Sequence, residues 1–145
     1  MNTPVGPLTL FEEDGALVAI EFGRAPDGDE TPLLREVKSQ LDRYFDRELE
    51  NFDLPLRPDG SAHDKAVWHH MSAIPYGHTR TYGELAKVAN SNARLVGAAC
   101  GNNPIPIVIP CHRVVGSDGK MTGYSGGSGI ETKTALLALE GAVLL

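Results

Sequence analysis

The stretch from residue 105 to residue 115, Ile-Pro-Ile-Val-Ile-Pro-Cys-His-Arg-Val-Val, most constrains how this chain folds. The apolar run at 105–109 predicts a buried strand. Because Pro110 has no backbone N–H to give to a sheet, we expect the strand to end there. The valine pair at 114–115 then returns the chain to the interior. The pattern therefore predicts that Cys111 stands at the edge of the core.

Cys111 is followed by two basic residues, His112 and Arg113. Positive charge beside a thiol lowers its pKa, and the thiolate is the form that acts as a nucleophile. A buried cysteine can also be no more than a small apolar side chain. Proline, histidine and arginine beside it are not typical of a core, so we favour a reactive thiol.

The length and the apolar pattern favour a soluble protein of the cytoplasm. The chain has 145 residues, enough for one domain or for two small lobes that share an interface. No apolar run approaches the roughly 20 residues of a membrane span, and the first residues show no secretory signal. A reducing cytoplasm would keep Cys100 and Cys111 as thiols.

The net charge of −6 is unevenly distributed along the chain. Residues 1–60 carry 6 Lys/Arg and 14 Asp/Glu, a net of −8, whereas residues 61–145 carry 7 Lys/Arg and 5 Asp/Glu, a net of +2. The acidic total therefore does not exclude a nucleic-acid-binding face on the second half. A net of +2 is also common on surfaces that bind no nucleic acid.

The beginning of the chain predicts a hairpin and a helix. Apolar-rich runs at 8–12 and 16–22 are joined by Glu-Asp-Gly, in which Asp-Gly is a hairpin signal. Apolar residues then recur at helical spacing over 31–47. Thr31 is a suitable N-cap, and the proline that follows suits the first helical position.

A boundary between two lobes is predicted near residue 60. Residues 52–56 suggest one more strand, and Pro-Asp-Gly-Ser at 58–61 then interrupts the chain. We therefore divide the chain into a βα lobe, residues 1–60, and a second lobe, residues 61–145. The first lobe offers no chemical constellation of its own.

Two short helices, 82–89 and 93–100, are predicted on either side of an Asn-Ser-Asn turn. Thr81 can cap the first helix, and Glu84 three residues later completes a capping box. This arrangement is typical of a helix-turn-helix, although an ordinary helical hairpin fits the same pattern. Alanine and glycine make the second helix slender, so its backbone can approach a groove closely.

Helices are also predicted at 62–73 and 130–139. The first of these regions contains three histidines, His63, His69 and His70. Metal ligands must converge on one point, whereas adjacent residues of a helix point in different directions. We therefore predict no metal site.

The sequence Pro-Cys-His-Arg-Val at 110–114 resembles the active-site motif of the 6-O-alkylguanine-DNA alkyltransferases, the methylated-DNA–protein-cysteine methyltransferases. The resemblance covers nearly the whole chain. It implies a mixed α/β (α+β) fold, in which a ribonuclease H-like N-terminal lobe precedes a helical, winged-helix-like lobe with a helix-turn-helix and an active-site loop. In that family the first lobe supports the second, and we expect the same role for residues 1–60. Further matching segments are Ile-Pro-Tyr-Gly at 74–77, Thr-Tyr-Gly-Glu-Leu-Ala at 81–86, Asn-Ala-Arg-Leu-Val-Gly-Ala-Ala at 92–99, Asn-Asn-Pro-Ile-Pro at 102–106 and Leu-Leu-Ala-Leu-Glu-Gly at 136–141.

The resemblance implies how the chain meets DNA. In that family the second helix of the motif enters the minor groove, which assigns Ala93 and Gly97 to the DNA contact. An arginine at the position of Arg94 fills the space left by the extruded base. A tyrosine at the position of Tyr82 helps to turn the nucleotide out. Asn103 matches the asparagine that ties the helix-turn-helix to the active-site loop.

The resemblance also implies a pocket for the extruded base. The glycine-rich loop at 122–127 forms one wall, on which Tyr124 would stack on guanine and Ser125 would help to polarise the leaving oxygen. Cys100 occupies a pocket position where relatives commonly carry a larger side chain. The other residues assigned to this pocket are Asn103, Val114 and Gly126.

The implied reaction is direct reversal of DNA damage, without a metal or an organic cofactor. After base flipping, the Cys111 thiolate takes a methyl or larger alkyl group from 6-O-alkylguanine; 4-O-alkylthymine is a second candidate substrate. His112 acts as base toward the thiol through water, Glu140 orients the imidazole, and Tyr82 assists the leaving guanine. The product is a thioether, so we expect a monomer that acts once on alkylated double-stranded DNA.

Two other functions fit parts of the sequence. Cys111 and His112 could serve a thiol hydrolase, but hydrolase pairs usually come from distant positions in the chain. A non-catalytic sensor of alkylated DNA is the second alternative. Relatives of that type carry tryptophan in place of Cys111, so the intact thiol favours the transferase.

Overall fold

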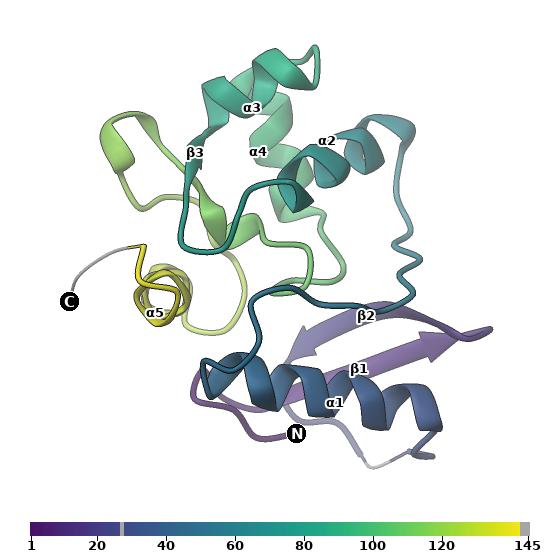
Figure 1. Cartoon of the computed structure of the whole chain (residues 1–145). Coiled ribbons are helices and arrows are strands. Elements are labelled where there is room, and N and C mark those ends of the chain that lie inside the picture. Colours follow the sequence, from purple (N-terminus) through teal and green to yellow (C-terminus); the bar gives the residue numbers. More distant parts are fainter. Residues whose placement is uncertain (27, 143–145) are drawn as a thin grey trace.

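The computed structural model describes residues 1–26 and 28–142. A β-hairpin and a helix come first in the chain, and Figure 1 shows them as the lower layer of the molecule. Most of the remaining helices lie above this layer. The fold is thus a mixed one, in which a small strand-and-helix lobe precedes a helical lobe, as the sequence predicted.

β1 (Leu8–Glu13) and β2 (Ala16–Phe22) form the antiparallel hairpin that the sequence predicted. Asp14 and Gly15 between them both have positive φ values, 49° and 78°. Two such residues make a type I′ turn, whose twist matches that of the flanking strands. The Asp-Gly pair therefore sets the pairing next to the turn, and an irregularity between Phe11 and Glu12 shifts the register of the remaining pairs.

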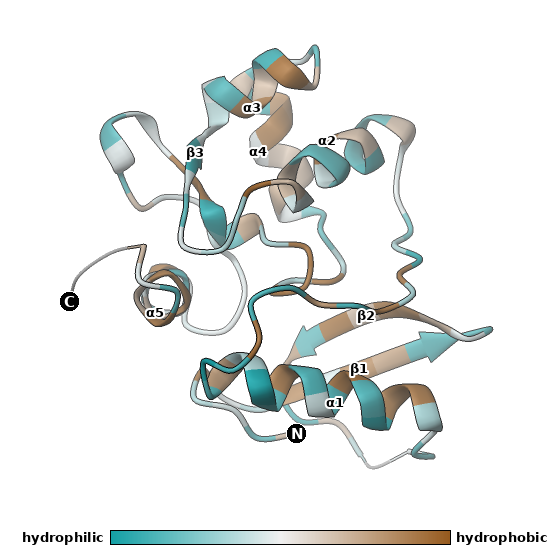
Figure 2. Cartoon of the chain, viewed as in Figure 1, coloured by the Kyte–Doolittle hydropathy of each residue, from teal (hydrophilic) through white to brown (hydrophobic). Residues whose placement is uncertain are grey.

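α1 (Pro32–Phe45) packs on the hairpin. Thr31 caps it, as predicted, because the Thr31 hydroxyl accepts a hydrogen bond from the Leu34 amide at 3.1 Å. Figure 2 shows hydrophilic and hydrophobic residues alternating along this helix, which marks an amphipathic surface element. Its fully buried apolar and aromatic side chains are Val37, Leu41 and Tyr44.

The strand predicted at 52–56 is wrong. Leu56 makes only an isolated parallel bridge with Leu17 of β2, in which the Leu17 amide donates to the Pro55 carbonyl at 2.8 Å. Prolines at positions 55 and 58 lack the N–H groups that a longer ladder requires. The segment therefore crosses the edge of the sheet without extending it.

Short helices and turns make up the second part of the chain. Within the described residues, no helix combines the length and the apolar character that crossing a membrane requires. The elements in order are α2 (Ala62–Ser72), β3 (Arg80–Thr81), α3 (Tyr82–Val88), α4 (Ala93–Gly101), η1 (Cys111–Arg113), β4 (Val114–Val115), η2 (Ser117–Gly119) and α5 (Ile130–Leu139). Because β3 and β4 pair in parallel, the start of α3 is tied to the segment that follows the Cys-His-Arg turn.

α3 and α4 carry the capping interactions expected of a helix-turn-helix. The Thr81 hydroxyl accepts from the Glu84 amide at 3.1 Å, and the Glu84 carboxylate accepts from the Thr81 amide at 3.0 Å. The Asn92 side chain caps α4 by accepting from the Leu95 amide. Asn90, with a φ of 52°, makes the turn between the two helices. Local polar residues thus set where both helices begin.

Residues 105–109 form a buried turn, and the strand predicted there is wrong. The Ile109 amide donates back to the Ile105 carbonyl at 2.9 Å, and Ile107 has a φ of 73°. A strand cannot contain such a backbone, and prolines at 104 and 106 remove two N–H groups. The three isoleucines are nevertheless at most 3% exposed. The apolar run therefore predicted correctly that this segment is buried, but it predicted incorrectly that its backbone is an extended strand.

A single hydrophobic core extends through both parts of the molecule. β2 contributes Leu17 and Ile20 to the same cluster as Trp68 of α2. The Ile20 amide also donates to the Pro104 carbonyl at 2.9 Å. β2 is thereby bonded directly to the segment that leads to Cys111.

Candidate active site

Cys111 lines a cavity of about 240 Å³. It is the first residue of η1 and is 6% exposed. The turn at 105–109 holds the preceding backbone in the core, and β4 does the same for the backbone that follows. Cys111 is therefore fixed on both sides, at the wall of a cavity and away from bulk solvent.

The cavity is built from four separate segments of the chain. They are the end of β2, the end of α4, the turn before Cys111 and the glycine-rich loop after η2. The contribution of β2, residues 19–22, was not expected from the sequence, because an alternating strand pattern carries no chemical signal. Of the residues assigned to the site, those on this wall are Cys100, Asn103, Cys111, Tyr124, Ser125 and Gly126.

Four residues assigned to the pocket or to the reaction lie outside the cavity wall: Val114, Tyr82, His112 and Glu140. We expected Val114 to line the pocket. It is instead fully buried in β4, and its side chain belongs to the hydrophobic core. Tyr82, at the start of α3, donates its hydroxyl to the Thr122 carbonyl at 3.2 Å. It therefore contacts the glycine-rich loop beside the cavity instead of lining the cavity itself.

The glycine-rich loop is held against the end of β2. A Cβ atom added at Gly126 would lie 2.4 Å from the Phe22 ring, so only glycine fits there. The Tyr124 ring meets Phe22 edge to face, with 6.2 Å between centroids. The Tyr124 hydroxyl is buried and has no hydrogen-bond partner among the described residues. The loop thus presents an aromatic ring and close-packed backbone to the cavity.

Asn103 connects the end of α4 to the turn before Cys111. Its side-chain amide donates to the Ile109 carbonyl at 2.9 Å, and its side-chain carbonyl accepts from the Ile105 amide at 3.0 Å. Both ends of the buried turn are therefore pinned by one side chain. A change at Asn103 would shift the position of the thiol.

Glu140, which follows the last residue of α5, accepts four hydrogen bonds in the interior. Its Oε2 accepts from His112 Nε2 at 2.8 Å and from the Tyr44 hydroxyl at 2.6 Å. Arg113 binds both oxygens, with Nε 2.8 Å from Oε1 and Nη2 3.0 Å from Oε2. Such a forked pair neutralises a buried carboxylate effectively. The structure therefore brings His112 and Glu140 together, and adds Arg113 and Tyr44.

The protonation of this cluster follows from its contacts. Burial alone would raise the pKa of Glu140, but the hydrogen bonds from His112, Arg113 and Tyr44 hold it at about 2. Glu140 is therefore a carboxylate that can only accept, so His112 carries its proton on Nε2. Burial lowers the pKa of His112. His112 is thus a neutral imidazole, and its buried Nδ1 has no hydrogen-bond partner within the described chain.

The expectation that His112 and Arg113 lower the pKa of the thiol is wrong. Both side chains bind the Glu140 carboxylate, and neither contributes a positive charge that lowers the pKa of the thiol. Burial raises the pKa of Cys111, while the Asn103 amide and the charge of Lys133 oppose this rise. The resting residue is therefore a thiol, which needs a base before it can attack.

Lys133 of α5 is a site residue that the sequence analysis missed. It is fully buried, and its Nζ donates to the Val114 carbonyl at 2.5 Å and to the Thr122 carbonyl at 2.6 Å. The ammonium also lies 5.8 Å from the centre of the Tyr82 ring. Lys133 thus joins β4, the glycine-rich loop and α3. A lysine within a predicted helix gave no signal of this role.

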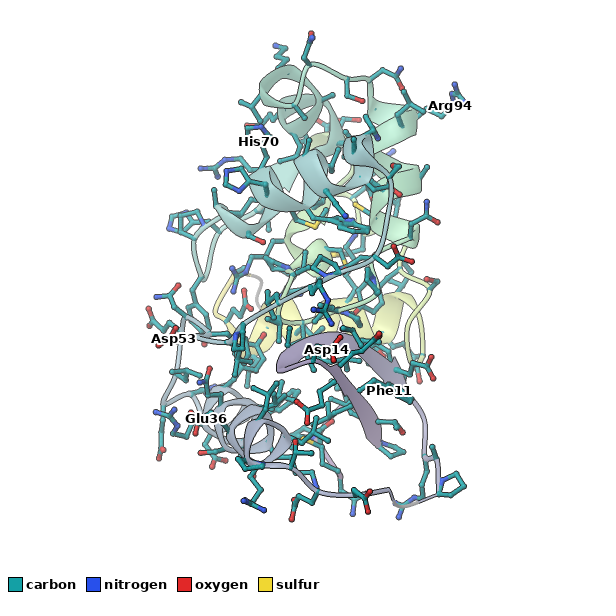
Figure 3. The ribbon with its side chains drawn as sticks, turned by 90° about the vertical axis from the view of Figure 1, so that its right-hand side faces the viewer. Phe11, Asp14, Glu36, Asp53, His70 and Arg94 are labelled. Atoms are coloured by element: carbon teal, nitrogen blue, oxygen red, sulfur yellow. The ribbon has the colours of Figure 1, made fainter. Side chains whose placement is uncertain are left out.

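α4 presents a separate, exposed face. Ala93 and Arg94 are exposed, and Gly97 is partly exposed, with no atom within 4 Å of an added Cβ. Figure 3 shows the Arg94 side chain extending outward from the helix. The face is therefore narrow and unobstructed, with a long cation at its beginning. It can approach another surface closely.

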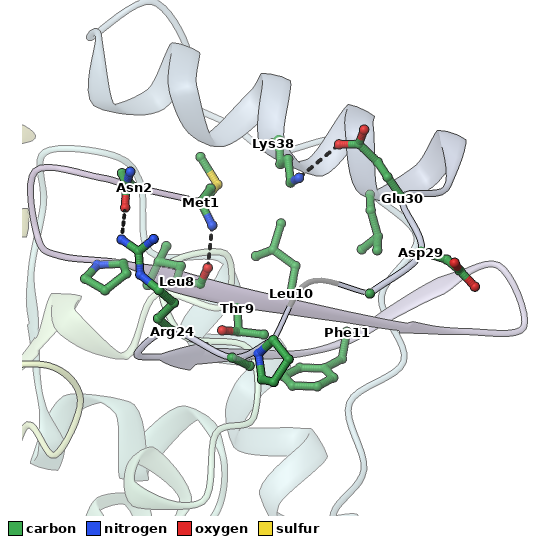
Figure 4. Close-up of a pocket in the computed structure, with 15 residues that line it drawn as sticks. Met1, Asn2, Leu8, Thr9, Leu10, Phe11, Arg24, Asp29, Glu30 and Lys38 are labelled. Atoms are coloured by element: carbon green, nitrogen blue, oxygen red, sulfur yellow. Dashed lines mark hydrogen bonds and ion pairs between the residues drawn. The ribbon is translucent and has the colours of Figure 1, made fainter.

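A larger cavity, of about 430 Å³, lies between β1, α1 and the loop that leads from β2 to α1 (Figure 4). Three of its charged side chains have partners: Lys38 pairs with Glu30 at 2.9 Å, and Arg24 donates to Asn2 at 2.8 Å. No thiol or imidazole lines it. Across residues 1–26 and 28–142 there is also no cluster of His, Cys, Asp and Glu suited to a metal ion. The reactive groups are therefore those around Cys111.

Comparison with known proteins places both parts of the chain in one family. Residues 1–58 match the ribonuclease-like domain of 6-O-methylguanine DNA methyltransferase, and residues 62–142 match its DNA-binding domain. The methylated-DNA–protein-cysteine methyltransferase of Methanosarcina acetivorans is 43% identical, over 97% of this chain and 96% of the relative. The same enzyme of Haemophilus influenzae is 42% identical, over 95% of this chain and 82% of the relative.

A solved structure agrees with these sequence matches. The crystal structure of Mycobacterium tuberculosis OGT in complex with DNA superposes with a TM-score of 0.88 at 41% identity, covering 98% of this chain and 91% of that chain. The chain belongs to the family of methylated-DNA–protein-cysteine methyltransferases.

Proposed function

We propose that this protein repairs DNA by transferring an alkyl group from 6-O-alkylguanine to Cys111, once per molecule. The observation that carries the proposal is the pairing of a cavity-lining thiol with a neutral histidine next to it. His112 is fixed through Nε2 on Glu140 at 2.8 Å, which leaves Nδ1 as a base. Family membership supports this reading, because relatives over almost the whole chain bear the name of that enzyme.

In the proposed reaction, His112 accepts the proton of the Cys111 thiol through a water molecule, as in other members of the family. The sulfur then attacks the alkyl carbon, a C–S bond forms, and the bond from that carbon to the guanine oxygen breaks. Glu140 stabilises the imidazolium that results. No step requires a metal or an organic cofactor. The thioether product has no simple route back to a thiol, so each molecule acts once.

The leaving guanine needs a proton or a hydrogen bond, which we assign to Tyr82. Its hydroxyl donates to the Thr122 carbonyl at 3.2 Å, which is longer than most hydrogen bonds between two oxygen atoms. Replacing the Thr122 carbonyl by the leaving guanine as the hydrogen-bond partner of Tyr82 would therefore cost little free energy. Tyr124 and Ser125 on the cavity wall remain the residues proposed to stack on the base and to polarise its oxygen.

An alkylated base must leave the DNA stack to reach the cavity. We assign this step to α4, whose face at Ala93 and Gly97 is slender enough for the minor groove and whose Arg94 is exposed. The partner is then double-stranded DNA with an alkylated guanine, bound by a monomer, with 4-O-alkylthymine a second candidate. In this division residues 61–145 bind DNA and accept the alkyl group, and residues 1–60 support them.

Two free, buried cysteines fit a reducing compartment, and we therefore place the protein in the cytoplasm. Oxidation of Cys111 would remove the proposed acceptor. A compartment that keeps thiols reduced is thus also a requirement of the proposed activity.

Intact-protein mass spectrometry with alkylated duplex DNA tests this proposal against a hydrolase and a sensor. We expect a stable gain of one alkyl group per molecule and no further consumption of DNA. The Cys111→Ala variant should bind DNA without gaining mass, whereas Cys100→Ser should still gain it. Continued turnover would indicate a hydrolase, and binding by the unmodified wild-type protein without any mass gain would indicate a sensor.

A further inference from the structure

Tyr44 connects the first lobe to the proposed relay. It lies on the buried face of α1, and its hydroxyl donates to Glu140 Oε2 at 2.6 Å. The two residues are 96 positions apart in the sequence. Oε2 is also the oxygen that accepts from His112. The first lobe thus touches the same carboxylate atom on which the proposed base depends.

We propose that Tyr44 is a positioning residue for alkyl transfer, whose hydroxyl holds Glu140 Oε2 and limits how strongly that oxygen attracts the proton of His112. The proposal rests on the proposed function above, because it gives His112 the task of accepting a proton from the thiol. It assigns the first lobe a direct part in the chemistry, beyond mechanical support.

Packing alone does not account for a tyrosine at this position. The ring is fully buried beside the rings of Phe45, Phe52 and Tyr76, at centroid distances of 5.2, 5.3 and 6.3 Å. A phenylalanine would satisfy such an aromatic cluster equally well. Burial of a hydroxyl is unfavourable unless it finds a partner. The hydroxyl of Tyr44 is therefore explained by Glu140 and not by its other neighbours.

Charge compensation does not account for the contact either. Arg113 already binds both oxygens of Glu140 through Nε and Nη2. A carboxylate paired in this way has its charge balanced without Tyr44. The remaining effect of the hydroxyl is on Oε2, where it competes with His112 for the same oxygen.

The direction of this effect follows from the charges around His112. Glu140 favours the imidazolium, whereas burial and the positive charges of Arg113 and Lys133 favour the neutral ring. Tyr76 is the other titratable group that faces Tyr44 and Glu140. Loss of the Tyr44 hydroxyl would concentrate negative charge on the side of Oε2 that faces His112. The imidazolium would then be favoured, and His112 would be protonated at a higher pH.

The variant Tyr44→Phe tests the proposal, with Tyr76→Phe as the matched control. The Tyr76 hydroxyl donates to the Leu139 carbonyl at 3.4 Å and makes no hydrogen bond to Glu140. Two readouts are needed: the titration of the His112 ring by NMR, and the single-turnover transfer rate as a function of pH. A hydrogen bond to a charged group changes an equilibrium by about tenfold, so we expect Tyr44→Phe to raise the His112 midpoint by about one pH unit.

Because only the neutral ring can accept the thiol proton, the rate of Tyr44→Phe should fall more at pH 6 than at pH 8. Tyr76→Phe should keep the wild-type profile. If Tyr44→Phe folds poorly, a fluorinated tyrosine at position 44 keeps the ring and makes the hydroxyl a stronger donor. It should move the His112 midpoint downward.

An unchanged midpoint in Tyr44→Phe, or a rate lowered by the same factor at every pH, would overturn the proposal and leave Tyr44 as a packing residue. A wild-type protein that transfers no alkyl group would instead overturn the proposed function. The NMR titration requires no alkylated DNA, so it still decides whether Tyr44 controls His112 in that case.

Discussion

At the scale of single residues, Glu140 determines the electrostatics of the site. Arg113, which the sequence suggested as an activator of the thiol, is 6% exposed and binds Glu140 at both oxygens. A buried carboxylate without such partners would be costly. The guanidinium therefore serves the carboxylate, and the carboxylate in turn fixes His112. Activation of Cys111 is left to the free Nδ1 of that histidine.

This arrangement predicts how stability depends on pH. The pKa of Glu140 falls from 4.5 to about 2 in the folded protein. A group with a depressed pKa stabilises the fold above its unfolded value and loses that contribution as pH falls through its folded value. Burial also lowers the pKa of His112 from 6.5, so its protonation begins to oppose folding below that pH. Both groups make the protein less stable in acid.

The variant Glu140→Gln isolates the lower part of this pH range. At pH 7 we expect its free energy of unfolding to fall by roughly 3 kcal/mol, because Arg113 loses a buried partner. The deficit should shrink as pH falls from 4.5 toward 2, where wild-type Glu140 is protonated as well. Urea unfolding at several pH values measures it. Glu131→Gln, an exposed carboxylate on the same helix, should change stability by at most about 0.5 kcal/mol.

A deficit that stays constant between pH 4.5 and 2 would show that Glu140 is not the titrating group.

Local sequence identified some of these residues and not others. Cys111 and His112 stand out because their neighbours are unusual for a core. Glu140 was found only through the resemblance of residues 136–141 to a family signature. Tyr44 and Lys133 gave no signal, because each occupies an ordinary helical position and meets its partner only in the folded chain. Polar contacts across 96 residues are set by tertiary structure.

At the scale of elements, boundaries set by local polar caps were predictable. Thr31, Thr81 and Asn92 each accept a hydrogen bond from the first turn of a helix, and this chemistry is readable in sequence. Residues 105–109 show the opposite case. An apolar run specifies burial, but a strand and a buried turn share that pattern. The prolines at 104 and 106, and the two hydrogen bonds from the Asn103 side chain, favour the turn over the strand.

The exposed face of α4 leads to a prediction about Arg94. If Arg94 fills the gap left by an extruded base, Arg94→Ala should strongly slow repair of duplex DNA, since flipping costs a few kcal/mol. Reaction with free benzylated guanine should slow little, because no base has to leave a stack. Arg94→Lys should be intermediate, since it keeps the charge and loses the flat guanidinium. Single-turnover rates on both substrates measure the effect.

The factor by which Arg94→Ala slows the reaction with duplex DNA, divided by the factor for free benzylated guanine, tests whether Arg94 acts in base flipping. A ratio near one would assign Arg94 to the protein surface alone, where its loss changes stability by no more than about 0.5 kcal/mol.

At the scale of the whole molecule, the charge is divided between the two parts of the chain. Residues 1–60 hold a net of −8 and residues 61–145 a net of +2, so an anionic duplex would be repelled by one end and accepted by the other. This asymmetry favours an orientation in which α4 meets DNA and the hairpin faces away. The overall value of −6 does not reveal it.

The supporting role first assigned to residues 1–60 does not describe the whole of their contribution. β2 forms part of the cavity wall, its Ile20 amide holds Pro104, and Tyr44 of α1 reaches Glu140. None of these contacts follows from the local pattern of a hairpin and an amphipathic helix. The hairpin and the five helices could be predicted in order from the sequence, but the way in which the two parts share one core could not. The boundary at residue 60 stays a prediction.

Peptide mapping after reaction with duplex DNA that carries an isotopically labelled methyl group on guanine tests the central claim most directly. Cys100 and Cys111 line the same cavity, so the assay offers the label two thiols. The account predicts one label per molecule, all of it on the peptide that contains Cys111. Label on Cys100, or label released as methanol while Cys111 remains a free thiol, would contradict it.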